Sequence, residues 1–125
     1  MSDPSTLKEE LAELAARLDT AARELYKLDK EAEQVDTNYE DTWNDLLVAL
    51  VDDHEANEKR LPGEDVRNAI ITKQIREADP ILYGNHRRLR REIERSEKFC
   101  KRLEREIEAK RSLLSFAKIE LEATA

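Results

Sequence analysis

The sequence predicts an all-α fold, a long antiparallel helical hairpin or coiled coil with a short helix at the bend. Charged residues make up 41% of the 125 positions and aromatic residues 5%, a composition typical of long helices. Apolar residues also recur at alternating spacings of four and three, the pattern of a helix that packs along another helix. With so few aromatic residues the chain cannot build a thick core alone. We therefore expect one helical domain over residues 1–125 that oligomerises through its apolar helix faces.

The first helix is predicted over residues 6–57. Ser5 is expected as its N-cap, and Glu9 and Glu10 place favourable negative charge near that end. From residue 43 the apolar pattern widens, which indicates burial on several sides where helices or subunits meet. The residues expected at this oligomer interface are Trp43, Leu46, Leu47 and Leu50. A ligand pocket around Trp43 is the alternative interpretation.

Residues 61–63, Leu-Pro-Gly, form the only strong turn signal in the chain. A shorter helix is predicted over 64–78 and a long one over 80–123, with Asp79 as N-cap and Pro80 as first helical residue of the latter. The turn lets the long helices fold back on each other. The apolar stripe expected on the short helix comprises Val66, Ile70, Ile71 and Ile75.

A seven-residue repeat runs through the last helix. Cys100 lies at a position of this seam, which favours a small buried hydrophobe over a reactive thiol. As the only cysteine it excludes an internal disulfide, so a reducing compartment is expected. The seam residues expected at an interface with a partner helix or subunit are Ile93, Cys100, Ile107 and Leu114.

Charge is distributed unevenly in this chain of net charge −7. Residues 1–60 carry 17 acidic and 7 basic side chains, whereas residues 86–111 carry 6 acidic and 11 basic ones. Seven of these bases recur at spacings of three and four, on one side of the helix, and such an array neutralises the phosphates of a nucleic-acid strand. This predicted nucleic-acid-binding stripe comprises Arg87, Arg88, Arg91, Arg95, Lys98, Arg102 and Arg105. The alternative is a solvated coiled-coil face, or one that pairs with an acidic neighbouring helix.

Aromatic residues near the basic stripe are scarce, namely Tyr83, Phe99 and Phe116. Any binding is therefore expected to involve the nucleic-acid backbone and to be insensitive to base sequence.

Two acidic patterns bear on catalysis. The helix His54 to Glu58 lacks the second histidine of a zinc-protease motif. The acids of 9–13 and 33–36 resemble the EExxE…ExxD signature of all-α nucleoside-triphosphate pyrophosphatases, which hold Mg²⁺ with those carboxylates. Here both halves fall along one uninterrupted helix, too far apart to share a metal. We expect no catalytic residue, metal or cofactor, and the pyrophosphatase stays a lesser alternative.

The C-terminal half resembles the small helical recombination mediators of bacteriophages, the UvsY type. The likeness rests on Phe99-Cys100, Leu103, Ile107, the basic pair Lys110-Arg111, and Phe116-Ala117-Lys118. The acidic N-terminal helix departs from that family. The resemblance implies a closed homo-oligomer that binds single-stranded DNA and helps a RecA-like recombinase to displace single-strand-binding protein.

The sequence shows no apolar run of membrane-spanning length, and Met-Ser-Asp-Pro is not the start of a signal peptide. We expect a cytoplasmic protein, in the host cytoplasm if it is phage-encoded, with no membrane partner. The alternative from a different class is a structural coiled-coil adaptor that binds a protein partner.

Overall fold

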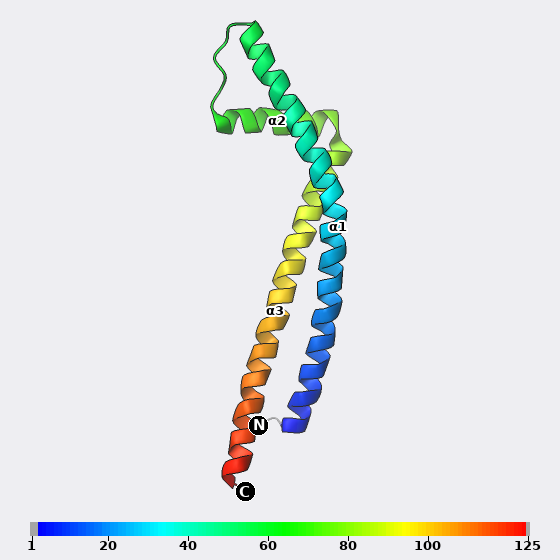
Figure 1. Ribbon diagram of the computed structural model, residues 1–125, viewed down its shortest axis with the longest axis vertical. Coiled ribbons are helices and arrows are strands. Elements are labelled where there is room, and N and C mark those ends of the chain that lie inside the picture. The colour runs from blue at the N-terminus through cyan, green and yellow to red at the C-terminus, as the bar shows by residue number, and fades with distance from the viewer. Residues whose placement is uncertain (1–2, 125) are drawn as a thin grey trace. The chain divides into compact units, whose positions relative to one another are not determined.

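The computed structural model describes residues 3–124 and contains helices and no strand within that range (Figure 1). The helices are α1 (Pro4–Ala56), α2 (Glu64–Ala78) and α3 (Pro80–Thr124). The all-α class predicted from the sequence is confirmed. The residues form two compact units. Unit 1 combines the described residues up to 27 with those from 93 onward, and unit 2 spans Leu28–Glu92, so α1 and α3 contribute to both.

Helix α1 begins at Pro4, earlier than the sequence suggested. The backbone N–H of Leu7 donates to the carbonyl oxygen of Asp3 at 3.0 Å, so Asp3 precedes the first turn. The expected N-cap at Ser5 is therefore wrong. Proline is favoured at the first helical position because its fixed φ suits the helix and its missing N–H would have no partner there.

The other end of α1 closes without a glycine. Glu58 adopts a left-handed φ of 52°, and the N–H groups of Glu58 and Lys59 donate to the carbonyls of Glu55 and His54 at 3.1 and 2.9 Å. These two bonds are those of the Schellman motif, in which glycine usually occupies the left-handed position. A residue with a Cβ is strained in that conformation.

The turn between α2 and α3 follows the sequence prediction closely. Asp79 ends α2 and its carboxylate oxygen Oδ1 accepts a hydrogen bond from the N–H of Leu82 at 3.0 Å, so its role as N-cap of α3 is confirmed. Gly63 precedes α2 and offers no side-chain cap, but its carbonyl oxygen accepts from Arg67 at 3.0 Å.

Unit 1 is an antiparallel pairing of α1 and α3 through the heptad positions. Leu14 and Ala21 of α1 form one buried cluster with Cys100, Leu103 and Ile107 of α3. Full burial of one leucine contributes about 1.5–3 kcal/mol, so this cluster is a main source of stability for the pair. The partly buried residues packed against the cluster are Leu11, Leu18, Leu25 and Phe99.

One seam position of α3 in this unit holds a lysine, and its charge is paired with a carboxylate of α1. Lys110 is half-buried, and its Nζ lies 2.6 Å from Oε2 of Glu10 on α1. A charge-assisted bond of this kind offsets the cost of withdrawing an ammonium group from water.

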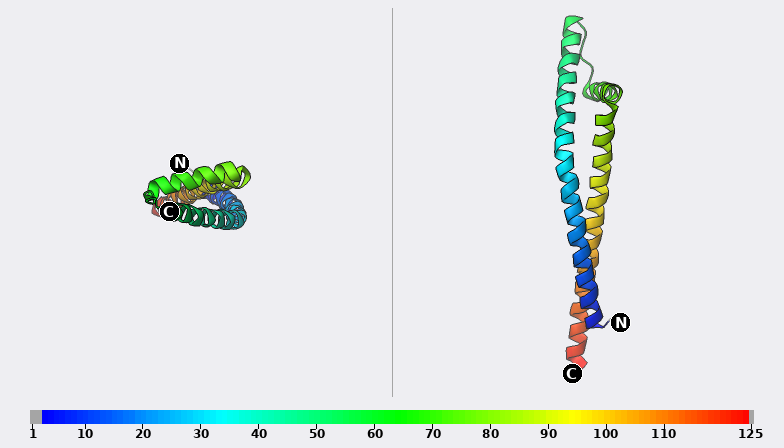
Figure 2. Two further views of the ribbon diagram at one scale, coloured as in Figure 1. Left: turned by 90° about the horizontal axis from the view of Figure 1, so that it is seen from above. Right: turned by 90° about the vertical axis from the view of Figure 1, so that its right-hand side faces the viewer.

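Unit 2 brings all three helices together, with α2 lying crosswise to its segments of α1 and α3 (Figure 2). Ile71 and Ile75 of α2 are fully buried, as is Leu89 of α3, and Ala32 of α1 is also in the core. Val66 was expected on the same apolar stripe, but it is 54% exposed, so that part of the prediction is wrong. Val66 lies in the first turn of α2, before the buried positions Ile71 and Ile75, and the core of unit 2 does not extend to it.

Replacing Glu58 by Gly should raise the free energy of unfolding by about 1 kcal/mol, because glycine removes the steric cost of the left-handed conformation. Urea denaturation followed by circular dichroism at 222 nm, the usual helix band, measures this change. The variant Glu58→Ala removes the carboxylate and keeps a Cβ, so it should not be stabilised. Equal stability of the two variants would contradict the Schellman assignment.

Candidate nucleic-acid interface

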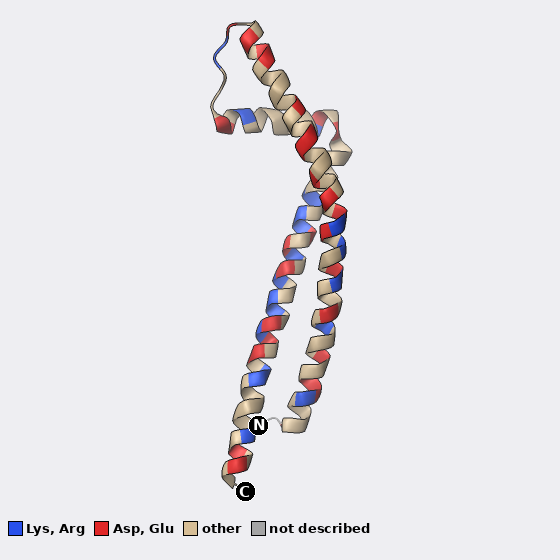
Figure 3. Ribbon diagram, viewed as in Figure 1, with Lys and Arg blue, Asp and Glu red and all other residues tan. Residues whose placement is uncertain are grey.

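All seven residues of the basic stripe are exposed on α3. Basic residues recur along this helix in Figure 3. Arg87, Arg88 and Arg91 belong to unit 2, and the other four belong to unit 1. The fold covers none of these seven side chains, so their charges are accessible in both units. The partners of the individual side chains differ.

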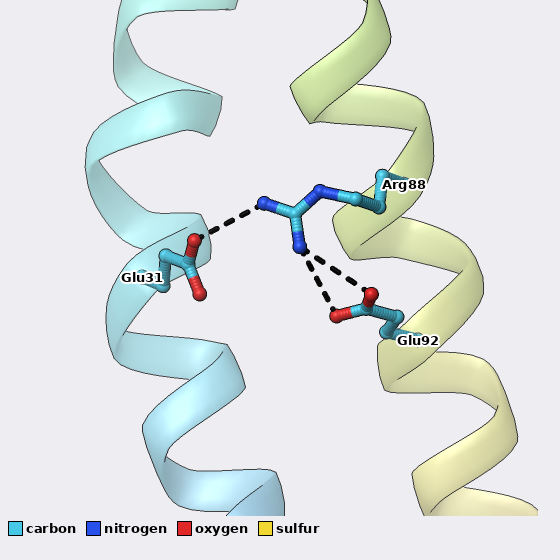
Figure 4. Close-up of polar contacts among 3 residues, drawn as sticks. All are labelled: Glu31, Arg88 and Glu92. Carbon is cyan, nitrogen blue, oxygen red and sulfur yellow. Dashed lines mark hydrogen bonds and ion pairs between the residues drawn. The ribbon is translucent and has the colours of Figure 1, made fainter.

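Arg88 is already neutralised within unit 2 (Figure 4). Its Nη2 lies 3.2 Å from Oε1 of Glu31 on α1, and its Nη1 lies 3.3 Å from both carboxylate oxygens of Glu92. Hydrogen bonds to Glu31 and then to Glu92 raise the pKa of Arg88. The alternative interpretation was that the stripe pairs with an acidic helix. For Arg88 this holds, and the acidic helix is α1 of the same chain.

Three arginines of the stripe have no such partner. Arg91, Arg95 and Arg105 form no ion pair and no hydrogen bond through their side chains with any residue between 3 and 124. Lys98 has a partner one turn away, Oε1 of Glu94 at 3.0 Å, but both side chains are largely exposed and such a pair is worth little in water. The stripe thus keeps free cations in unit 2 and in unit 1.

The remaining two arginines lie over aromatic rings. The guanidinium carbon of Arg102 is 5.3 Å from the ring centroid of Phe99. That of Arg87 is 5.5 Å from the centroid of Tyr83, and its Nη1 also donates to the Tyr83 hydroxyl at 2.9 Å. Sequence reasoning missed both pairs, although the spacings of three and four place each pair on one side of a helix.

The residues predicted to form an oligomer interface divide into two groups. Cys100 and Ile107 are only 8% and 7% exposed, because α1 of the same chain covers them in unit 1. The surface they leave for another subunit is therefore small. The half-buried group comprises Ile93 and Leu114 of unit 1 and Trp43, Leu46, Leu47 and Leu50 of unit 2.

A different apolar surface near the end of α3 escaped the sequence analysis. Leu113, Phe116 and Ile119 are 52%, 58% and 62% exposed, and their spacing of three places them on one side of the helix. The heptad pattern identifies only the seam of α3, and these three residues lie outside it.

A polar cluster sits inside unit 2, where His86 of α3 stacks on Tyr39 of α1. The ring centroids are 3.8 Å apart and the planes differ by 3°. The Nε of Arg90 donates to Nε2 of His86 at 2.9 Å, so this nitrogen carries no proton and the neutral ring holds its proton on Nδ1. Oδ1 of Asp36 lies 3.4 Å from the same Nε2 and becomes a partner only when the ring is protonated.

The surroundings of this cluster favour its uncharged forms. Burial and then Arg90 lower the pKa of His86, and together they outweigh Asp36, which acts in the opposite direction. Burial and then Tyr83 raise the pKa of Tyr39, against smaller opposing effects of a hydrogen bond with Thr72 of α2 and of Arg90. The cluster therefore joins all three helices of unit 2 with neutral rings at neutral pH.

The acidic residues that resemble a pyrophosphatase signature do not gather into a metal site. Across residues 3–124, no three His, Cys, Asp or Glu side chains lie close enough to hold one metal ion.

None of the helices over this same stretch carries an apolar run that would cross a bilayer. Comparison with protein-family models, curated proteins and solved structures found no match to this chain.

Unit 2 should lose stability as the pH falls through the range where histidine titrates. The unfolded ring has a pKa of about 6.5 and the folded ring a lower one, so the contribution of His86 is complete above about pH 6.5 and declines below it. Unfolding free energies measured at about pH 7.5 and about pH 5.5 should differ more for the natural chain than for His86→Phe. Phenylalanine keeps a ring against Tyr39 and cannot titrate. The same pH dependence in both proteins would contradict this assignment.

Proposed function

We propose that this protein is a non-enzymatic, single-stranded-DNA-binding accessory protein that acts as an oligomer. The observation that carries the proposal is the set of free cations on α3, Arg91, Arg95 and Arg105, which are exposed and lack acidic partners among the described residues. An arginine without an intramolecular carboxylate can bind a phosphate without first breaking an ion pair.

Binding to phosphates would be mainly electrostatic. Each phosphate neutralised releases condensed counterions, so affinity for a single strand should fall with the logarithm of salt concentration by a slope of about 0.7 per contact. Base sequence should have little influence, since phosphate contacts carry no base information. This profile suits a protein that coats a strand regardless of its sequence.

We further propose a role as a phage recombination mediator that assists a RecA-like recombinase against single-strand-binding protein. Support comes from the C-terminal residues that resemble the UvsY type, of which Cys100, Leu103 and Ile107 belong to the buried cluster of unit 1. The antiparallel pairing through heptad positions supports a coiled-coil arrangement. Half-buried Trp43, Leu46, Leu47 and Leu50 retain apolar surface that a second copy would cover.

A structural adaptor is the second candidate, because of one specific observation. The exposed side of α3 formed by Leu113, Phe116 and Ile119 is the kind of apolar stripe that packs on a partner helix. In that case the basic stripe would only be solvated, and the chain would not retain a single-stranded oligonucleotide even at low salt.

Replacing Arg95 and Arg105 together by Ala should weaken binding of a labelled single-stranded oligonucleotide and reduce the salt slope by about 0.7 for each lost phosphate contact. Fluorescence anisotropy at about 50 and about 200 mM salt measures both quantities. The matched control is Arg111→Ala with Lys118→Ala, which removes the same charge from exposed positions of α3 outside the stripe. It should leave the slope unchanged.

Arg88→Ala should weaken the same binding less than Arg91→Ala, although the two residues are neighbours on α3. Glu31 and Glu92 already neutralise Arg88, whereas Arg91 has no acidic partner among residues 3–124. Equal losses in the anisotropy titration would contradict the division into paired and free arginines. Absence of binding by the natural chain would favour the adaptor.

A further inference from the structure

Phe99 lies beside the basic stripe and forms part of the wall of a cleft in unit 1. The side chain is half-buried and packs against the core cluster. The cleft is shallow and wide open to solvent, has a volume of about 430 Å³ and is otherwise lined by α1. The lining residues from α1 are Glu13, Ala16, Arg17, Thr20, Ala21 and Glu24.

The chemistry of this cleft suits a flat ring with a polar edge. Phe99, Ala16 and Ala21 supply apolar surface, and the carboxylates of Glu13 and Glu24 are acceptors for amino groups. Thr20 is less available, because its hydroxyl already donates to the carbonyl of Ala16 at 3.2 Å. A nucleobase has two apolar faces and an edge of donors and acceptors, so it matches this combination.

The cleft also lies close to the cations that would hold a strand. Arg102 sits over the Phe99 ring, and Arg95 and Lys98 are within about one helical turn of Phe99 on the same helix. A strand whose phosphates contact these cations would bring its bases to the ring. The guanidinium carbon of Arg102 lies 5.3 Å from the ring centroid, so a cation already lies beside the ring.

We propose that Phe99 stacks on an unpaired nucleobase that enters this cleft, and that this contact makes unit 1 prefer single strands over duplex. The inference rests on the proposed function and adds a base contact to it. A base in a duplex is paired and stacked on its neighbours, so it cannot reach the ring without being extruded. Stacking on an aromatic side chain contributes about 1–3 kcal/mol per base and tolerates any base, so sequence insensitivity is retained.

The other aromatic residues of α3 are less suited to this role. Phe116 belongs to the same unit and is 58% exposed, but no arginine or lysine among residues 3–124 lies over its ring. Tyr83 belongs to unit 2, and its hydroxyl is engaged by Arg87. Phe116 therefore serves as the matched control.

The test compares Phe99→Leu with Phe116→Leu in anisotropy titrations with single-stranded and duplex oligonucleotides. Leucine keeps apolar packing against the core cluster and removes the ring. Phe99→Leu should weaken single-strand binding about fivefold or more, which corresponds to the lower end of stacking energies. Duplex affinity and the salt slope should stay unchanged, because no phosphate contact is lost. Phe116→Leu should match the natural chain, and Phe99→Trp should restore binding.

An abasic oligonucleotide separates stacking from an indirect effect on folding. On a strand without bases, the difference between Phe99→Leu and the natural chain should disappear. A loss of equal size on the abasic strand would overturn the inference, as would unaltered single-strand binding by Phe99→Leu. If Phe99→Leu binds normally while Arg95→Ala with Arg105→Ala does not, the proposed function stands and only the stacking contact fails. If the natural chain binds neither strand, both are wrong.

Discussion

The heptad contact between α1 and α3 in unit 1 is the interaction on which its other features depend. Leu14 and Ala21 meet Cys100, Leu103 and Ile107, and this burial determines which side of α3 faces inward. Core contacts fix the rotation of α3 about its own axis, so the sides of α3 away from the seam face solvent. The basic stripe lies on such a side and is therefore exposed. The same contact places Phe99 at the edge of the seam, partly in the core and partly in a cleft.

Local charge, rather than net charge, decides what this surface can bind. The whole chain carries −7, which would by itself repel a nucleic acid. Salt screens exposed charges beyond about 10 Å at 0.1 M, so a phosphate at the stripe responds mainly to the nearest cations. Within the stripe, the positive charge of Arg88 is neutralised by its ion pairs, whereas Arg91, Arg95 and Arg105 have no acidic partner among residues 3–124. Counting basic residues along α3 therefore overstates the number of charges available to a ligand.

Unit 2 relies on a different kind of contact where its helices meet. Ile71, Ile75 and Leu89 are fully buried, but the stacked rings of Tyr39 and His86 lie among polar groups. Burial and Arg90 lower the pKa of His86, so the stacked pair contributes most to stability while the imidazole ring is neutral. Among the described residues of unit 1, the contacts between α1 and α3 are apolar apart from the Lys110–Glu10 ion pair, so the two units depend on different kinds of contact.

Several features could be predicted from the amino-acid sequence alone: the helical class, the turn around Pro62, the cap at Asp79 and the seam residues Leu103 and Ile107. These follow from local rules, since periodicity and capping depend on residues within one or two turns of each other. The exposure of the basic stripe follows in the same way, from its place away from the seam.

Which arginines are free, and where Phe99 lies, depends on contacts between segments far apart in the sequence. Glu31 and Arg88 are 57 residues apart, and whether they meet depends on the axial register and rotation of α1 against α3. The exposure of Val66 likewise reflects how much of α2 the neighbouring helices cover. A one-dimensional pattern records which residues share a face of a helix, but the pairing of two faces is settled by packing between segments distant in sequence.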